Sequence, residues 1–370
     1  MKRIIALSLA LVLLLCGCGG NRQTNDTPET TVPVETETAA PETTAEPTTE
    51  PTTVPTEPPV VYFNPLNGEI LDEPFTDRIF ANTVSNLQEN LPHVGVTQAD
   101  MIIETYVNLN NVVRCLALFT DIESVDAIGA TRSTRPMFND IAQHYDLILS
   151  HAGGSDHALE DARNRGIDNF NIDSWVVAST GASYRDTEYK RSYENTLFGI
   201  GSGIKAYAES QGMEMNLERD YGFRFTEDGT PAEGEDAQQV SVVLTYGQAK
   251  KETVMVYDAE LDKYVWNQYG QVMADQITGE TEAFTNVIIL FTDITTEGIY
   301  HVTEFTNGGL GYYANGGKII PIIWSCDGDD QPLRFMTEDA QELLLGQGNT
   351  YIAICTPESP VTYGAAEAAE

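Results

Sequence analysis

Two short segments carry residues suited to hold an anion. Arg132-Ser133-Thr134-Arg135 places two guanidinium groups three residues apart, and His151-Ala152-Gly153-Gly154-Ser155 follows a buried apolar run. A guanidinium binds a carboxylate or a phosphate through two parallel hydrogen bonds. Glycines let the backbone approach a ligand closely, and free amides at the start of a helix attract negative charge. The two segments therefore predict an anion site.

Each segment also has a structural interpretation, which stays open. Asp156, at the start of the following helix, would occupy the same amides, so residues 151–155 also fit a plain glycine-rich turn. One of the two arginines would then pair with an acid of the chain, such as Asp140 or Glu123, on a solvated face.

We expect the two segments to share one site. Arg132 and Arg135 open one helix and residues 151–155 follow the next strand, so both lie at an edge of one sheet, where α/β proteins bind ligands. Two guanidinium groups that face one space repel each other unless something negative lies between them. That group is either a bound anion or an internal acid, for which Glu104 is the first candidate.

An enzymatic alternative uses His151 as a general base and Ser133 or Ser155 as a nucleophile. Such a pair needs contact at about 3 Å and an orienting carboxylate, for which Asp168 and Glu104 are available. No GxSxG motif surrounds either serine. The five histidines lack metal-ligand spacing, and no CxxC or HExxH motif occurs, so neither a metal nor a cofactor is expected. We lean away from an enzyme, towards a binding or scaffold module.

The elements that position these residues alternate in the first half of the chain. Residues 97–100 resemble a capping box and predict a short helix over 99–107. Apolar runs at 112–119 and 146–150 predict buried strands. Helices are predicted over 137–145, with Pro136 at the first turn, and over 156–165, closed by Gly166. This order is typical of an α/β layered domain.

The second half reads as one strand after another from about Gln239, with a single helical period at 337–346. Ala314-Asn315-Gly316-Gly317 predicts a hairpin turn. The fold class is therefore α/β (α+β): a layered α/β N-terminal domain at 61–204 and a β-rich C-terminal domain at 239–357. Residues 205–238 are expected to connect the two, and 358–370 to form a flexible tail.

The amino terminus predicts an export signal and a lipid anchor. Residues 1–17 combine two basic residues with an apolar run, and Leu15 and Gly17 precede Cys18 as in a bacterial lipobox. Two acyl chains on Cys18 suffice for stable anchoring. Residues 18–60 are rich in Thr, Pro and Glu, which predicts a disordered stalk. We expect the outer face of the cytoplasmic membrane of a Gram-positive bacterium.

The net charge limits the binding partners of the protein, and the cysteines limit its possible disulfides. The 370 residues carry a net charge of −36, which argues against binding to nucleic acid. Cys115 lies in an apolar run and is expected to be buried. A disulfide between Cys326 and Cys355 stays an open alternative.

The chain resembles the YerB-like lipoproteins, a Gram-positive family of unknown function. The resemblance covers about 64–357 and is most specific at R-S-x-R-P and H-x-G-G-S. The matching positions are Asn86, Pro92, Gly95, Ala99, Asp100, Glu104, Arg114, Ile128, Gly129, Arg132, Ser133, Arg135, Pro136, His151, Gly153, Gly154 and Ser155.

The resemblance implies a two-part α/β fold and an envelope lipoprotein, and it brings no established activity. It adds Asn86, Glu104 and Arg114 to the candidate ligand-binding residues. The chain departs from the family pattern where a downstream histidine is replaced by Glu194, which counts against a catalytic role for that histidine.

We therefore expect a surface lipoprotein that displays an Arg/His/Gly-lined anion site. Its expected partners are the membrane, through Cys18, and an anionic cell-wall ligand or an envelope protein. The alternative is an envelope hydrolase or transferase that uses His151 with Ser133 or Ser155.

Overall fold

The computed structural model describes residues 61–366, apart from 109–111, 189–190 and 247–248. The predicted signal peptide, the lipidated Cys18 and the stalk at 18–60 lie outside the described residues, as does the end of the predicted tail. Among the helices that are described, none is long and apolar enough to cross a membrane.

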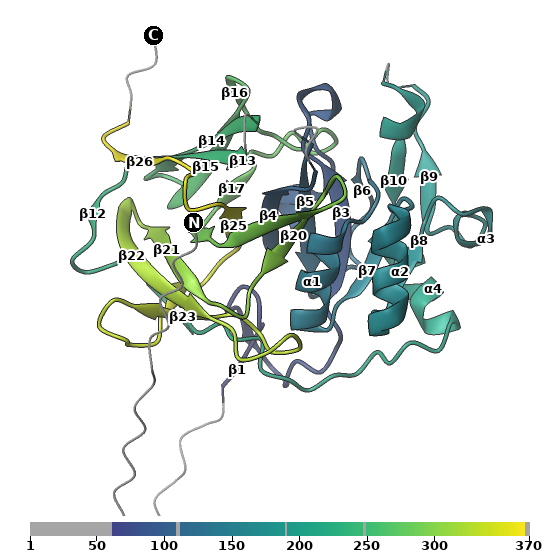
Figure 1. Ribbon diagram of the computed structural model, residues 1–370, viewed down its shortest axis with the longest axis horizontal. Helices are drawn as coiled ribbons and strands as arrows, with labels where there is room; N and C mark the ends of the chain where they lie inside the picture. Colours follow the sequence, from purple (N-terminus) through teal and green to yellow (C-terminus); the bar gives the residue numbers. More distant parts are fainter. Residues whose placement is uncertain (1–60, 109–111, 189–190, 247–248, 367–370) are drawn as a thin grey trace, which may run out of the picture. The chain divides into compact units, whose positions relative to one another are not determined.

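The first half combines short strands with helices (Figure 1). Its elements are β1 (Tyr62–Phe63), β2 (Ile70–Leu71), β3 (Phe80–Ser85), β4 (Met101–Tyr106), β5 (Val113–Phe119), β6 (Ile128–Gly129), α1 (Pro136–Tyr145), β7 (Ile148–His151), α2 (Asp156–Arg165), β8 (Asn169–Asn171), α3 (Trp175–Ala178), β9 (Ser183–Arg185), β10 (Leu197–Gly199) and α4 (Gly201–Ser210).

The described part of the second half contains strands alone. They are β11 (Phe225–Thr226), β12 (Glu235–Asp236), β13 (Gln239–Tyr246), β14 (Ala249–Asp258), β15 (Lys263–Gln268), β16 (Gln271–Val272), β17 (Ala283–Phe284), β18 (Asn286–Phe291), β19 (Asp293–Glu297), β20 (Tyr300–Glu304), β21 (Gly309–Asn315), β22 (Lys318–Ser325), β23 (Arg334–Thr337), β24 (Leu345–Gly346), β25 (Thr350–Cys355) and β26 (Val361–Gly364).

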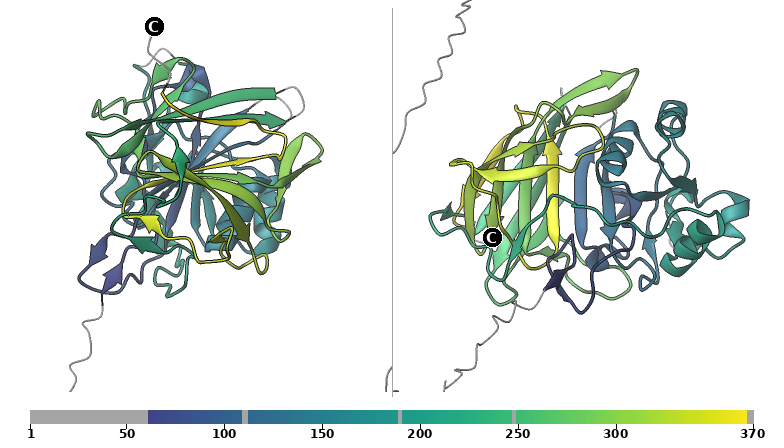
Figure 2. Two further views of the ribbon diagram at one scale, coloured as in Figure 1. Left: turned by 90° about the vertical axis from the view of Figure 1, so that its left-hand side faces the viewer. Right: turned by 90° about the horizontal axis from the view of Figure 1, so that it is seen from below.

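One eleven-stranded sheet runs through both halves of the sequence. Its order is β12-β22-β21-β18-β25-β4-β5-β3-β7-β8, with β23 beside β22. The halves meet where β25 pairs in parallel with β4, from Thr350 opposite Met101 to Ile354 opposite Thr105. Figure 2 shows the yellow strand β25 next to the blue strands of the first half. A second sheet has the order β16-β15-β14-β13-β26, with β17 beside β15.

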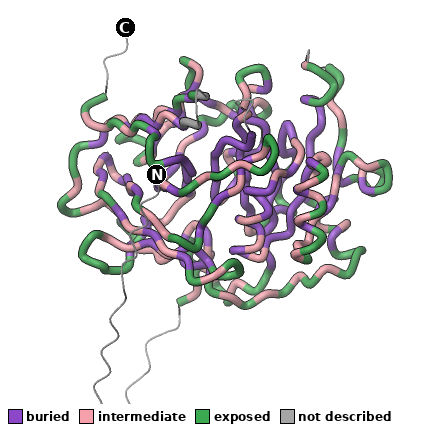
Figure 3. The backbone as a smooth tube through the Cα atoms, in the orientation of Figure 1, coloured by how far each residue is buried: buried purple, intermediate pink, exposed green. Residues whose placement is uncertain are grey.

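Both faces of the main sheet are covered, so its central strands are buried throughout (Figure 3). On one face, Ile102 and Cys115 pack in a core that includes Val242 and Trp266 of the second sheet. On the other face, the next residues of the same strands join the core of α1. This alternation decides which polar side chains of β4 and β5 can meet.

The predicted helix over 99–107 is wrong, because these residues contain strand β4. A strand that is buried on both faces lacks the alternation that identifies half-exposed strands. The capping-box residues have other contacts: Val96–Gln98 form a 3-10 turn, and the Asp100 carboxylate accepts hydrogen bonds from Thr120. The helix predicted from the period at 337–346 is also wrong, because this segment contains the end of β23 and strand β24.

The other main elements are confirmed, and with them the α/β class. Helices α1 and α2 have the predicted ends, with Pro136 in the first turn of α1 and Gly166 at φ +70° after α2. Gly316 and Gly317, both with positive φ, form the turn between β21 and β22. The expected domain limit at 204 falls within α4, and Val361–Gly364 of the expected tail form β26, which pairs with β13.

The shared sheet predicts that the halves unfold together. A chain that ends after Gly346 lacks β25 and exposes the apolar edges of β4 and β18, so we expect it to lose cooperative thermal unfolding. A chain that ends after Gly364 keeps every described strand and should melt like the full protein. Calorimetry and circular dichroism measure both. A cooperative transition that persists without β25 would show that the fold does not depend on the pairing of β25 with β4 and β18.

Candidate anion site

The two predicted segments lie side by side. The Ala152 amide donates to the Arg132 carbonyl at 2.9 Å, and the Thr134 amide donates to the Gly153 carbonyl at 2.9 Å. The Ser133 hydroxyl donates to the Ala152 carbonyl at 2.8 Å. The contact arises because residues 132–135 lead from β6 into α1 and residues 152–155 lead from β7 into α2, next to the parallel pair β3 and β7.

Both glycines are required by the turn after β7. Gly153 has a φ of +69°, a conformation that other residues adopt at a cost. A Cβ at Gly154 would lie 2.8 Å from the Leu159 side chain. The amide of Gly153 donates to Asn171 at 2.9 Å. The turn is therefore fixed, and its first glycine amide is already used inside the protein.

The start of α2 offers less to an anion than the sequence suggests. Ser155 is the N-terminal cap, and its hydroxyl accepts a hydrogen bond from the Ala158 amide at 3.1 Å. A capped helix start has fewer free amides. Positive charge at this site therefore comes chiefly from arginines.

Arg114 is the central cation of the site. Arg114 is 3% exposed. One of its terminal nitrogens donates to the Ser133 carbonyl, and its Nε has no hydrogen-bond partner among the described residues. Burial lowers the pKa of Arg114 well below its usual range, and the charges of Arg135 and Arg132 lower it further, against the smaller opposing effect of the Glu194 carboxylate. No carboxylate of the described residues pairs with Arg114.

Arg135 also lies without an acid partner among the residues that the structure describes. It donates to the Thr134 carbonyl at 2.6 Å, and its guanidinium lies 5.2 Å from the ring centre of Tyr300. Tyr300 belongs to β20, in a hairpin of the second half that packs on α1. Burial lowers the pKa of Arg135. Tyr300 is a site residue that sequence reasoning missed, because nothing local connects it to Arg135.

Arg132 has an internal acid, but not one of those expected. It pairs with the Glu194 carboxylate at 3.1 Å and donates to the Asn195 side chain at 2.9 Å. The Glu194 side chain is 67% exposed, so the pair is open to solvent and to competing anions.

The acids considered as internal partners bind other cations. Asp140 pairs with Arg165 at 2.6 Å, and Glu123 pairs with Lys205 at 2.8 Å. The arginines of residues 132–135 therefore do not have either acid as their ion-pair partner.

Glu104 and Asn86 lie apart from the arginines. Glu104 is opposite Cys115 in the sheet, whereas Arg114 is opposite Thr105. Because neighbouring strand residues point to opposite faces, Glu104 and Arg114 are separated by the sheet. Glu104 pairs instead with Lys251 of β14, and Asn86 donates to Glu104. Glu104 therefore does not complete the arginine cluster.

Among the described residues, His151 has no serine partner. It is 1% exposed, its Nε2 contacts Asn169 at 3.1 Å, and burial lowers its pKa. Ser133 and Ser155 use their hydroxyls for the backbone contacts described above. Asp168 pairs with Arg78 at 2.6 Å. The described residues therefore do not form the Ser–His–carboxylate arrangement that the enzymatic alternative requires.

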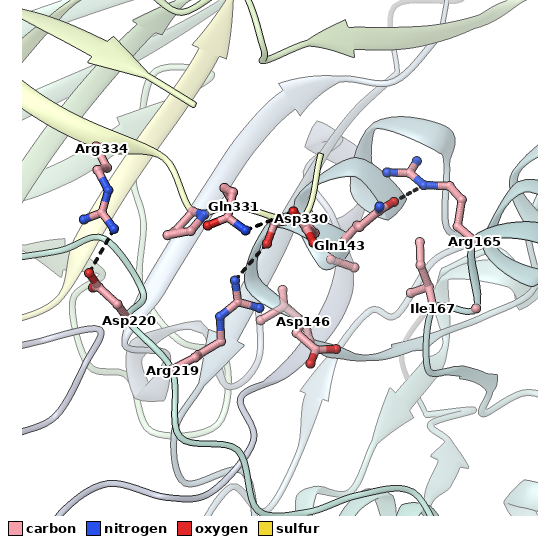
Figure 4. Close-up of a pocket in the computed structure, with 13 residues that line it drawn as sticks. Gln143, Asp146, Arg165, Ile167, Arg219, Asp220, Asp330, Gln331 and Arg334 are labelled. Carbon is pink, nitrogen blue, oxygen red and sulfur yellow. Dashed lines mark hydrogen bonds and ion pairs between the residues drawn. The ribbon is translucent and has the colours of Figure 1, made fainter. Parts of the chain in front are cut away.

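A polar cavity of about 510 Å³ beside α1 also contains arginines and can be compared with the surroundings of Arg114 (Figure 4). It contains Arg165, Arg219 and Arg334, but these are compensated. Arg334 pairs with Asp220 at 3.0 Å, and Arg219 donates to the Asp330 carbonyl at 3.1 Å. Arg165 pairs with Asp140 and Asp161 outside the lining. The cavity is therefore balanced in charge, unlike the surroundings of Arg114.

The described His, Cys, Asp and Glu side chains include no group that could hold a metal ion. Cys115, Cys326 and Cys355 are all buried and free, so the open alternative of a disulfide is not realised.

Comparison with models of protein families shows which family the chain belongs to. The protein of unknown function (DUF3048) N-terminal domain matches residues 66–214, and the corresponding C-terminal domain matches residues 242–352. These matches cover more than half of the chain, so the protein belongs to the DUF3048 family. The resemblance found in the sequence is thereby confirmed.

A curated relative and a solved structure agree with this family. "Putative lipoprotein YerB" of Bacillus subtilis (strain 168) is 24% identical over an alignment of 302 residues, and the alignment covers 78% of this chain and 85% of the relative. The crystal structure of the YerB protein from Bacillus subtilis is similar with a TM-score of 0.67 and 22% identity. It covers 81% of this chain and 99% of that one. At this identity the structural match shows the fold.

The contrast between Arg78 and Arg114 predicts that Met substitution lowers stability much more at Arg78 than at Arg114. Arg78 is 4% exposed, pairs with Asp146 and Asp168 and also donates to the Glu214 carbonyl, so Arg78→Met should lower the free energy of unfolding by about 2–3 kcal/mol through the lost hydrogen bonds. Arg114→Met removes a buried charge that has no acid partner, so its effect should stay within about 1 kcal/mol. Urea denaturation measures both. A loss at Arg114 as large as that at Arg78 would show that Arg114 is structural.

Proposed function

We propose that this protein is a lipid-anchored surface module that binds an anionic group of an envelope ligand through Arg114, Arg132 and Arg135. The anchor is supported by Leu15 and Gly17 before Cys18 and by the name of the Bacillus relative, a putative lipoprotein. The anchor places the folded part at the outer face of the cytoplasmic membrane of a Gram-positive bacterium.

The observation that carries the proposal is the uncompensated charge of Arg114. A buried cation costs free energy unless it is paired. This chain has 56 acidic residues and 20 lysines and arginines, so acids are abundant. Arg114 nevertheless lies among other arginines with an unused Nε. An external carboxylate or phosphate would supply the missing negative charge.

Binding to a wall polymer tests the proposal. The full chain is titrated by calorimetry with teichoic acid, which carries phosphate, and with peptidoglycan stem peptides, which carry carboxylates. Arg114→Gln and Arg135→Gln should each weaken binding about tenfold or more, because each removes a charged hydrogen bond. Arg185→Gln is the matched control, since Arg185 already pairs with Asp173 at 2.6 Å. Equal binding by all three variants, or binding by none of the proteins, contradicts the proposal.

Glu194 should act as an internal competitor. Its exposed carboxylate pairs with Arg132, so Glu194→Gln should tighten binding of the same anion up to about fivefold. Stability should change by less than about 1 kcal/mol. The measurement is the same titration, with thermal melting as the control. Weaker binding after this change would assign Glu194 to the recognition of the ligand itself.

A further inference from the structure

A second polar cluster lies inside the core between the main sheet and the second sheet. Its centre is Glu104, whose side chain is fully buried. Nζ of Lys251, with a side chain 3% exposed, lies 2.5 Å from Oε1 of Glu104. Nδ2 of the fully buried Asn86 donates to the same oxygen. One carboxylate oxygen thus holds an amine and a carboxamide side by side.

Aromatic and hydroxyl groups surround this cluster. The ring centres of Trp266 and Tyr269 lie 5.6 Å and 5.7 Å from Nζ of Lys251. The hydroxyls of Thr253 and Tyr351 donate to Oε2 of Glu104. Burial raises the pKa of Tyr351 well above its usual range, so this hydroxyl keeps its proton. The carboxylate is therefore held in one orientation with little access for water.

The carboxamide of Asn86 is held from its other side. Nε2 of Gln268 donates to Oδ1 of Asn86 at 2.7 Å, and the Tyr269 hydroxyl donates to the Asn86 backbone carbonyl at 3.0 Å. A donor on a carbonyl oxygen stabilises the negative charge that forms when a nucleophile adds to the carbon. An amine buried next to a carboxylate can transfer its proton within the pair and become nucleophilic.

We propose that Lys251 and Asn86 become joined by an intramolecular isopeptide bond, with Glu104 as the proton carrier. The bond would link the end of β3, in the first half of the chain, to β14, in the second half. It is separate from the arginine site and independent of the function proposed for that site.

The reaction balances within the chain. Glu104 takes a proton from the Lys251 ammonium, and the neutral Nζ attacks Cγ of Asn86, with the oxyanion on Oδ1 facing Gln268. Glu104 returns the proton to Nδ2, the Cγ–Nδ2 bond breaks and ammonia leaves, while the second proton of Nζ passes to Glu104 and from there to solvent. An ammonium and a carboxamide thus become a secondary amide and, after protonation in solvent, an ammonium ion. No oxidant, metal or cofactor is needed.

Peptide mapping of the full chain by mass spectrometry tests the bond. Trypsin cleaves after Arg78, Arg114, Lys250 and Lys263, but not after a Lys251 whose amine is acylated. We expect peptide 79–114 joined to peptide 251–263, lighter than the sum of the two by about 17 Da, the mass of ammonia. The reaction needs this chain alone, so the link is expected in protein made in any host.

Two variants provide controls. Glu104→Gln keeps the amine and the carboxamide but lacks the proton carrier, so its map should show peptides 79–114 and 252–263 separately. Lys250→Arg changes the exposed neighbouring lysine, keeps the cleavage site and should retain the link. Recovery of separate 79–114 and 252–263 from the unmodified full chain overturns the proposal and leaves Lys251 and Glu104 as a buried ion pair. That result does not depend on whether either variant folds.

Discussion

The parallel pairing of β25 with β4 is the constraint on which the rest of the structure depends. It carries one sheet through both halves of the chain and gives each half a covered edge. The hairpin of β19 and β20 can then place Tyr300 over Arg135, and β14 can place Lys251 against Glu104. Each polar cluster combines residues of both halves, so neither half contains a complete site.

The alternation of side chains along β4 and β5 separates the two clusters. Glu104 and Cys115 share one face of the sheet, and Thr105 and Arg114 share the other. A shift of one residue would bring the acid to the arginine and cancel both charges. The actual register leaves Arg114 without an acid partner among the described residues and directs Glu104 to an amine. The arginine cluster and the buried Glu104 cluster therefore arise from neighbouring residues of the same strands.

The buried arginines of this chain differ in charge compensation. Arg78 holds two carboxylates, and the arginines around the cavity of Figure 4 have acids or carbonyls as partners. Such cations stabilise the fold. Arg114 and Arg135 lack such an acid partner in the described part of the chain and donate to backbone carbonyls instead. Under the proposed function, a bound anion would offset the cost of burying Arg114.

The sequence by itself determined the family, the α/β class, the ends of α1 and α2 and the contact between residues 132–135 and the turn after β7. These follow from local signals: caps, glycines, apolar runs and neighbouring strands. Tertiary structure alone decided that residues 101–106 form a strand, because burial on both faces removes the pattern that marks one. It also decided that Arg132 pairs with Glu194 and Glu104 with Lys251. Sheet register and long-range pairing set these contacts, and neither is encoded by spacing along the chain.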